Sequence, residues 1–303
     1  MIYTVTLNPS IDYIVRLEQL HLGEVNRMDE DFKFPGGKGI NVSRILNRIQ
    51  VPNTAFGLIG GFTGQFINDI LQAEGTNTEF ITIQDDTRIN VKIKAEMETE
   101  INGKGPKVTK EEQEALKKQM KQLTKEDVVV LAGSVPPALS QGFYEELIQL
   151  IKEAGASFVI DTTGKDLMTS LSYQPLLVKP NNHELAELFN TSFATQEEIY
   201  PYAEKLLAMG AKHVLISMAG DGALYFHENK RYFAQPLKGE LKNSVGAGDS
   251  MIAGFIGGLE KTNDPLEAFK MGVACGSATA FSDDLADEAF IQKYLKQVKI
   301  TEL

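Results

Sequence analysis

Short apolar runs alternate with amphipathic stretches along most of the chain from about residue 105 onward. Runs such as 128–132 and 214–217 have the length and apolar content of single buried strands. Stretches such as 110–123 and 143–154 show helical spacing of their apolar positions. This alternation predicts a parallel sheet with helices on both faces. The other strands predicted in this part are 158–160 and 176–178, and the other helices are 184–189, 197–209 and the stretch that follows residue 249.

The first hundred residues have a different pattern. Segments 12–20 and 87–98 alternate apolar and charged positions, which is typical of strands with one solvated face. Between them, 36–49 opens with glycines and continues with helical spacing. We therefore expect one domain over residues 1–303, with a small β lid built from insertions at roughly 10–35 and 86–105. Near the end, 222–226 and 230–233 should form a hairpin.

Composition limits the kinds of partner that this chain can bind. Of its 303 residues, 43% are hydrophobic and 23% charged, which suits a large folded core. The net charge of −11 disfavours nucleic acid and anionic lipid, so an anionic ligand must be held by local positive charge and backbone dipoles. The single cysteine, Cys275, excludes an internal disulfide. No apolar stretch is long enough to span a bilayer, and we expect a cytoplasmic protein.

One glycine-containing segment, 243–249, has the composition of a phosphate site. Gly246, Ala247 and Gly248 directly precede a predicted helix, where backbone N–H groups and the helix dipole favour negative charge. Asp249 follows at once, as a carboxylate that could accept the proton of an attacking hydroxyl. On spacing alone, an ordinary helix N-terminus with an acid in its first turn explains these residues equally well.

A second glycine cluster, 35–41, also precedes a predicted helix. Its Lys38 and Asn41 could bind sugar hydroxyls or phosphate, although by itself the cluster is better explained as a tight turn. Neither cluster matches the P-loop fingerprint or the Gly-x-Gly-x-x-Gly of dinucleotide-binding folds. The sequence therefore argues against Walker-type NTPases and NAD-dependent dehydrogenases.

Taken together, these segments resemble the ribokinase-like (PfkB) carbohydrate kinases, from residues 7–12 to the helix after Pro265. The N-terminal signature of that family resembles 36–41, and its C-terminal signature, usually Asp-Thr-x-Gly-Ala-Gly-Asp, resembles 243–249. Here Asn243 and Ser244 replace the Asp-Thr pair, as they do in the phosphosugar branch. The resemblance implies a three-layer α/β/α sandwich with a mainly parallel central sheet and a small β-sheet lid.

The resemblance also implies a role for individual residues. Asp249 would be the catalytic base, and the amides of Gly246, Ala247 and Gly248 would form an anion hole for the transferred phosphoryl group. Asp12, with Gly37 and Asn41, would hold the sugar. ATP would be the co-substrate, with Mg²⁺ as cofactor. The residues expected to bind the nucleotide are Lys179, Ser217, Met218, Ala219, Gly220, Asp221, Gly222 and Gly248.

Asn181 and Glu184 resemble the Asn-x-x-Glu element of the family, which acts on Mg²⁺ and its waters. The same two residues are explained without any metal as the cap and third residue of a helix that starts after Pro180. Residues 273–277 fall where many sugar kinases complete the adenine pocket with an asparagine, which this chain lacks, so the adenine contacts stay open.

The expected substrate already carries a phosphate, because Arg27, Lys38 and Arg88 fall in the lid strands and glycine turn where the family receives its sugar. Taken singly, each arginine is better explained as a solvated surface charge. The reaction implied is attack of the C6 hydroxyl of fructose 1-phosphate on the γ-phosphate of ATP, giving fructose 1,6-bisphosphate and ADP. Tagatose 6-phosphate is the alternative substrate.

A function of another class is a non-catalytic sugar-phosphate sensor with the same fold. We also expect a homodimer joined through the lid strands, because open sheet edges invite association.

Overall fold

The computed structural model describes residues 1–140 and 142–303. Its main feature is an eleven-stranded sheet in the order β15-β14-β13-β12-β11-β10-β9-β1-β4-β5, with β6 paired to β4. Neighbours from β12 to β5 pair in parallel, and β13, β14 and β15 add an antiparallel edge. The strands are β1 (Ile2–Thr6), β4 (Asn53–Gly60), β5 (Asn77–Thr78), β6 (Ile81–Ile83), β9 (Val128–Ala132), β10 (Ser157–Asp161), β11 (Leu177–Val178), β12 (His213–Ser217), β13 (Ala223–His227), β14 (Lys230–Ala234) and β15 (Ile300–Glu302).

Helices cover both faces of this sheet because its strands are apolar on both sides. In β9, Val129 and Leu131 join one buried cluster, whereas Val130 and Ala132 join the other. The first cluster packs against α3 (Lys110–Met120), α4 (Phe143–Glu153), α5 (Gly164–Leu171), α6 (Asn182–Leu188) and α7 (Tyr200–Ala208). The second packs against α1 (Lys38–Arg48), α8 (Ala247–Thr262), α9 (Pro265–Ala280) and α10 (Glu288–Leu295). The predicted fold class, a layered α/β sandwich with a mainly parallel sheet, is confirmed.

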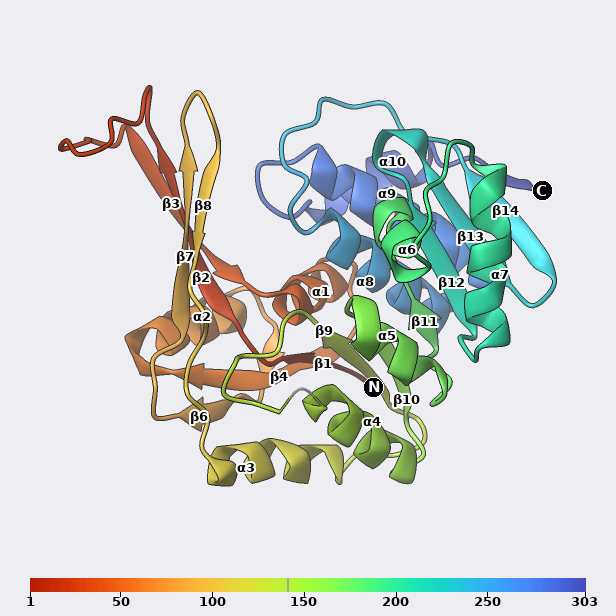
Figure 1. The fold of residues 1–303 in the computed structure, drawn as a ribbon, viewed down its shortest axis with the longest axis horizontal. Coiled ribbons are helices and arrows are strands. Elements are labelled where there is room, and N and C mark those ends of the chain that lie inside the picture. Colours follow the sequence, from red (N-terminus) through yellow and green to blue (C-terminus); the bar gives the residue numbers. More distant parts are fainter. Residues whose placement is uncertain (141) are drawn as a thin grey trace.

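A second, four-stranded sheet projects from the body at the upper left of Figure 1, in the order β3-β2-β7-β8. Its strands are β2 (Ser10–Arg16), β3 (Glu30–Gly36), β7 (Arg88–Lys94) and β8 (Thr99–Asn102). We call this sheet the lid. Helix α2 (Gly61–Ala73) packs beneath it. The parallel pairing of β2 with β7 places Asp12 beside Asn90 and Ser10 beside Arg88.

Several boundaries differ from the sequence prediction. Strands β2 and β7 end at Arg16 and Lys94, earlier than expected, because the residues after them are turns and connections. The helix expected over 197–209 is a 3₁₀ turn, Glu197–Ile199, followed by α7, whose first turn contains a proline. The hairpin of β13 and β14 is confirmed, with Glu228 at its turn in the left-handed region at φ 52°. No helix in the described part of the chain is both long and apolar enough to cross a bilayer.

Candidate active site

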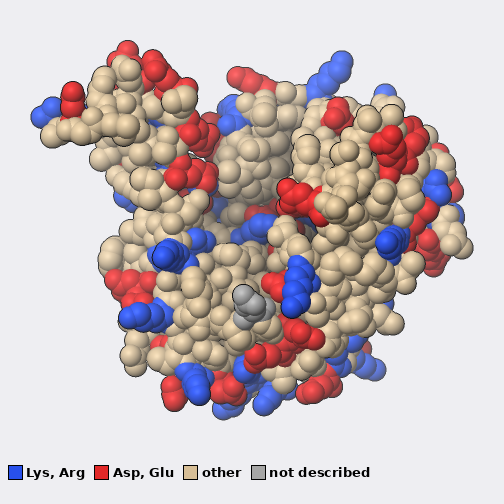
Figure 2. Space-filling model, in the orientation of Figure 1, with Lys and Arg blue, Asp and Glu red and all other residues tan. Residues whose placement is uncertain are grey.

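A cleft of about 1010 Å³ lies between the lid and the large sheet, and Figure 2 shows the molecule hollowed there. It lies at the carboxyl ends of the parallel strands, where open α/β sheets bind their ligands. The volume is at the upper end of the usual range for ligand pockets. Of the residues proposed from sequence for substrate, nucleotide and metal, all except Arg27 line this cleft.

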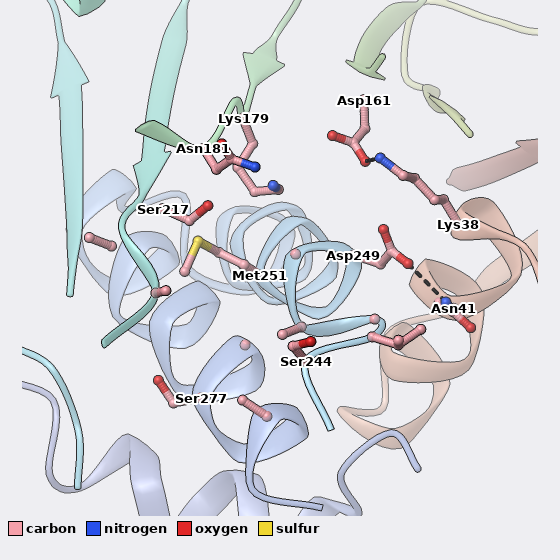
Figure 3. Close-up of a pocket in the computed structure, with 18 of the residues that line it drawn as sticks. Lys38, Asn41, Asp161, Lys179, Asn181, Ser217, Ser244, Asp249, Met251 and Ser277 are labelled. Atoms are coloured by element: carbon pink, nitrogen blue, oxygen red, sulfur yellow. Dashed lines mark hydrogen bonds and ion pairs between the residues drawn. The ribbon is translucent and has the colours of Figure 1, made fainter. Parts of the chain in front are cut away.

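Asp249 lies in the first turn of α8, at the bottom of the cleft. The residue is 6% exposed, and its carboxylate accepts a 2.8 Å hydrogen bond from Asn41 Nδ2, at the start of α1 (Figure 3). Burial, together with the nearby charge of Asp161, raises the pKa of Asp249 to about 6, although Lys38, Asn41 and Lys179 act in the opposite direction. A carboxylate with this pKa is ionised near neutral pH and basic enough to accept a proton.

The residues before Asp249 turn the chain into α8. Gly246 caps the helix in the left-handed region at φ 78°, a conformation that favours glycine. A β-carbon at Gly248 would lie 3.0 Å from Lys179 Nζ, so the ammonium group of Lys179 lies against the backbone of this turn. Lys179 directly follows β11 and is 7% exposed. The turn therefore combines backbone donors of a helix N-terminus with a fixed cation, which suits a phosphoryl group.

A second carboxylate, which the sequence analysis did not identify, faces Asp249 across the cleft. Asp161 is the last residue of β10, and its Oδ2 lies 2.7 Å from Lys38 Nζ. Burial opposes the charge on Lys38, but Asp161, with Asp249 and Glu184, outweighs it and raises the pKa of Lys38. Figure 3 shows Asp161, Lys38, Asp249 and Asn41 converging on one space. The only signal in the sequence was an acid at the end of an apolar run.

The lid contributes a polar surface to the same cleft. Asp12 Oδ1 accepts hydrogen bonds from Ser10 Oγ at 2.8 Å and Asn90 Nδ2 at 3.1 Å, and Asp12 Oδ2 lies 3.0 Å from Lys92 Nζ. Arg88 is also in the cleft wall. Asn90 and Lys92 were missed by the sequence analysis, because only the register of β2 against β7 brings them to Asp12.

Among the residues proposed to bind the substrate, Arg27 alone does not line the described cleft. It lies in the exposed connection between β2 and β3 and not on a lid strand, and it is absent from the described cleft wall. The expected placement on a lid strand is wrong because β2 ends at Arg16, which leaves Arg27 in the connection that follows. Its role in binding the sugar stays a prediction.

The proposed nucleotide segment, 217–222, begins at the last residue of β12 and lines the far end of the cleft. It forms a 3₁₀ turn, Ala219–Asp221, with Ala219 at φ 48°. Opposite it, α9 contributes Val273, Gly276 and Ser277. Apolar groups from the 235–245 segment and the end of α9 complete this end, namely Pro236, Leu237, Leu241, Val245 and Phe281. An apolar slot beside turns that offer backbone N–H and C=O groups suits a flat heterocycle.

Asn181 and Glu184 form a reciprocal capping box at the start of α6. Glu184 N donates to Asn181 Oδ1, and Asn181 N donates to Glu184 Oε2, both at 2.8 Å. Both residues also line the cleft. Within residues 1–140 and 142–303, no group of three or more His, Cys, Asp or Glu side chains is placed to hold a metal ion directly.

The chain is similar to known carbohydrate kinases over most of its length. The model of the pfkB family carbohydrate kinases matches residues 5–288. The 1-phosphofructokinase of Bacillus subtilis is 50% identical over the full length of both chains. The D-tagatose-1-phosphate kinase of Bacillus licheniformis is 37% identical, again over the full length of both chains. The structure of phosphofructokinase-2 from Escherichia coli in complex with fructose-6-phosphate superposes with a TM-score of 0.91, at 28% identity and with 98% of each chain covered.

Proposed function

The chain belongs to the pfkB family of carbohydrate kinases, and from that premise we propose that it phosphorylates fructose 1-phosphate at the C6 hydroxyl. The products are fructose 1,6-bisphosphate and ADP. The observation that carries the chemistry is Asp249, a buried carboxylate with a raised pKa at the N-terminus of α8. Full-length identity of 50% to a 1-phosphofructokinase supports the choice of sugar.

In this proposal Asp249 accepts the proton of the C6 hydroxyl while the backbone amides of 246–248 bind the migrating phosphoryl group. Asn41 orients the carboxylate through its 2.8 Å hydrogen bond. Lys38 and Lys179 offset the negative charge that gathers around the transferred group, and both act on Asp249 electrostatically. The adenine base would lie between segment 217–222 and α9, beside Phe281.

Arg88 and the polar residues around Asp12 would hold the phosphosugar. Asp12 accepts from hydroxyls, and Arg88 provides N–H donors that match a phosphate. Because Asp12 is already paired with Lys92, the carboxylate is fixed in place before the sugar arrives.

Mg²⁺ is the metal that this donor set fits. Amide and carboxylate oxygens of Asn181, Glu184 and Asp161 line the cleft, and Mg²⁺ prefers such ligands while keeping several waters. The capping box uses Glu184 Oε2, so Glu184 Oε1 is the oxygen available to a hydrated ion. When bound with ATP, Mg²⁺ neutralises phosphate charge.

The same proposal includes a homodimer and a cytoplasmic location. Ile89 and Ile101 lie on adjacent strands of the lid and are 40% and 59% exposed. Apolar groups at this exposure on a protruding sheet favour contact with a second copy of the chain. A kinase of soluble phosphosugars that consumes ATP is expected in the cytoplasm.

The test of the proposed function is the product and its dependence on Asp249. With MgATP and fructose 1-phosphate, ³¹P NMR should show the resonances of fructose 1,6-bisphosphate and ADP. Asp249→Ala should lower kcat by at least about 10², with sugar-phosphate binding nearly unchanged, as expected when a general base is removed. Binding of fructose 1-phosphate without any turnover by the wild-type protein would instead indicate a sugar-phosphate sensor.

A further inference from the structure

Four segments of backbone connect the lid to the body, and three of them meet at Asn8. Asn8 itself lies between β1 and β2. Arg88 is the first residue of β7, where the connection from β6 ends, and Lys104 lies in the connection from β8 to α3. Asn8 Nδ2 donates to Lys104 O at 3.2 Å and, in the body, to Ser134 Oγ at 3.4 Å. The Asn8 carbonyl accepts from Arg88 Nη2 at 3.1 Å and from Arg88 Nε at 3.3 Å.

The side chain of Asn8 is closely enclosed at this junction. It is 6% exposed, and a β-carbon at Gly105 would lie only 2.4 Å from Asn8 Oδ1. Gly105 has φ 108°, so the chain leaving the lid both turns sharply and packs directly against the amide. Within the described parts of the chain, Asn8 Oδ1 meets no hydrogen-bond donor. A buried acceptor without a partner is unfavourable for stability, so stability alone does not explain an amide at this position.

The same junction holds Arg88 by hydrogen bonds that leave some of its N–H donors unused. Besides its bonds to the Asn8 carbonyl, its Nη1 donates to Gly103 O at 2.7 Å. A guanidinium has five N–H donors. The contacts made by the described residues use one donor on each of the three nitrogens, which leaves one N–H on each Nη group. Arg88 lines the cleft, so these N–H groups can bind an anion while the carbonyls keep the guanidinium oriented.

A chain of hydrogen bonds then continues from Arg88 to the carboxylate of Asp12, which is proposed to bind the sugar. Gly103 N donates to Asn90 Oδ1 at 3.2 Å, and Asn90 Nδ2 donates to Asp12 Oδ1 at 3.1 Å. Asn8, Arg88, Asn90 and Asp12 all line the cleft. Displacement of the 103–105 segment would therefore move both Arg88 and Asn90.

We propose that Asn8 is a positioning residue that joins the lid to the body and sets the orientation in which Arg88 and Asn90 meet the phosphosugar. This inference rests on the proposed function for its ligand and extends it to a residue with no assigned role. The residues proposed to bind the nucleotide, such as 217–222, lie on the other side of the cleft. Substitution of Asn8 should therefore weaken binding of the sugar and not of MgATP.

The experiment compares Asn8→Ala with the wild type and with Asn102→Ala, a matched control on the exposed end of β8 whose side chain contacts Glu100. In Asn8→Ala, KM for fructose 1-phosphate should rise about tenfold, because a charge-assisted contact loses its geometry, while KM for MgATP stays within about twofold. Amide hydrogen exchange of peptides covering 103–107 should become faster in the free protein. Asn102→Ala should change neither quantity.

Ser134→Ala removes one acceptor of the Asn8 amide and should raise the same KM by a smaller factor, about twofold to threefold. If Asn8→Ala does not fold, the KM of Ser134→Ala for fructose 1-phosphate tests the proposal in its place. An unchanged KM for the sugar would overturn the proposal, and so would equal rises for both substrates. A raised KM with wild-type exchange at 103–107 would mean that Asn8 touches the sugar directly, which also overturns a positioning role.

Failure of the proposed function gives a different result. In that case the wild type turns over no phosphosugar, while the exchange comparison at 103–107 in the free protein still decides whether Asn8 holds the junction.

Discussion

Asp249 and Asp161 both lie near Lys38, and their charges affect the pH dependence of the reaction. The pKa of Asp249 is raised to about 6, first by burial and then by Asp161. A general base works only when it is deprotonated, so kcat/KM should fall roughly tenfold per pH unit below about pH 6. A steady-state pH profile measures this directly.

Asp161→Asn tests the electrostatic part of that prediction. The substitution removes a negative charge that raises the pKa of Asp249 and leaves the positive charge of Lys38 in place. The acid limb of the kcat/KM profile should therefore move to lower pH. Asp69→Asn, on the exposed face of α2, should leave the profile unchanged. An acid limb at the same pH in Asp161→Asn would contradict this description of the site.

The sequence predicted some of these residues and not others, for physical reasons. Lys38, Asn41 and Asp249 were proposed because each follows glycines before a predicted helix, in segments that resemble the signatures of the family. Asp161 and Asn90 had no such local signal, since strand order and register alone place them in the cleft. Their positions depend on contacts between distant parts of the chain.

Helices α8 and α9 pack closely through glycines, and this contact supports the helix that carries Asp249. A β-carbon at Gly254 would lie 2.6 Å from Met271 O, and one at Gly258 would lie 2.8 Å from Ala268 Cα. Periodicity predicted α8 from its buried face. It did not predict this contact, because a helical glycine in a sequence does not show which backbone lies beside it.

Gly254→Ala should therefore force α8 and α9 apart and lower the free energy of unfolding by about 1–3 kcal/mol. Urea denaturation measures this difference. The matched control is Gly142→Ala, at the N-cap of α4, where a β-carbon meets no described atom within 4 Å. A loss of stability no greater than that of the control would show that the two helices are not in close backbone contact.

At the scale of the whole molecule, the lid protrudes from the body (Figure 1). Ile89 and Ile101 lie on its adjacent strands β7 and β8 and are exposed. We expect sedimentation at micromolar concentration to give a dimer. Ile101→Lys should shift it toward monomer, because burial of a lysine in an apolar contact is costly. Leu303→Lys, at the C-terminus on the opposite side of Figure 1, should not. A monomeric wild-type protein would contradict the prediction.

The general architecture was predictable from periodicity, since the two-sided apolar strands and amphipathic helices in the second half indicate a covered parallel sheet. The position of Arg27 was not predictable in this way, because the length of the connection after β2 depends on where pairing with β3 and β7 stops. Local patterns specify elements, whereas the path of a long connection depends on the assembled molecule.

The proposed activity of the cleft is the phosphorylation of fructose 1-phosphate. It is tested most directly by kcat/KM values measured with MgATP for fructose 1-phosphate, tagatose 6-phosphate, tagatose 1-phosphate, fructose 6-phosphate and ribose. We expect fructose 1-phosphate to have the highest value by at least about tenfold, and ribose to have almost none, because it lacks the phosphate that Arg88 would bind. A higher kcat/KM for a tagatose phosphate or for fructose 6-phosphate would contradict the claim.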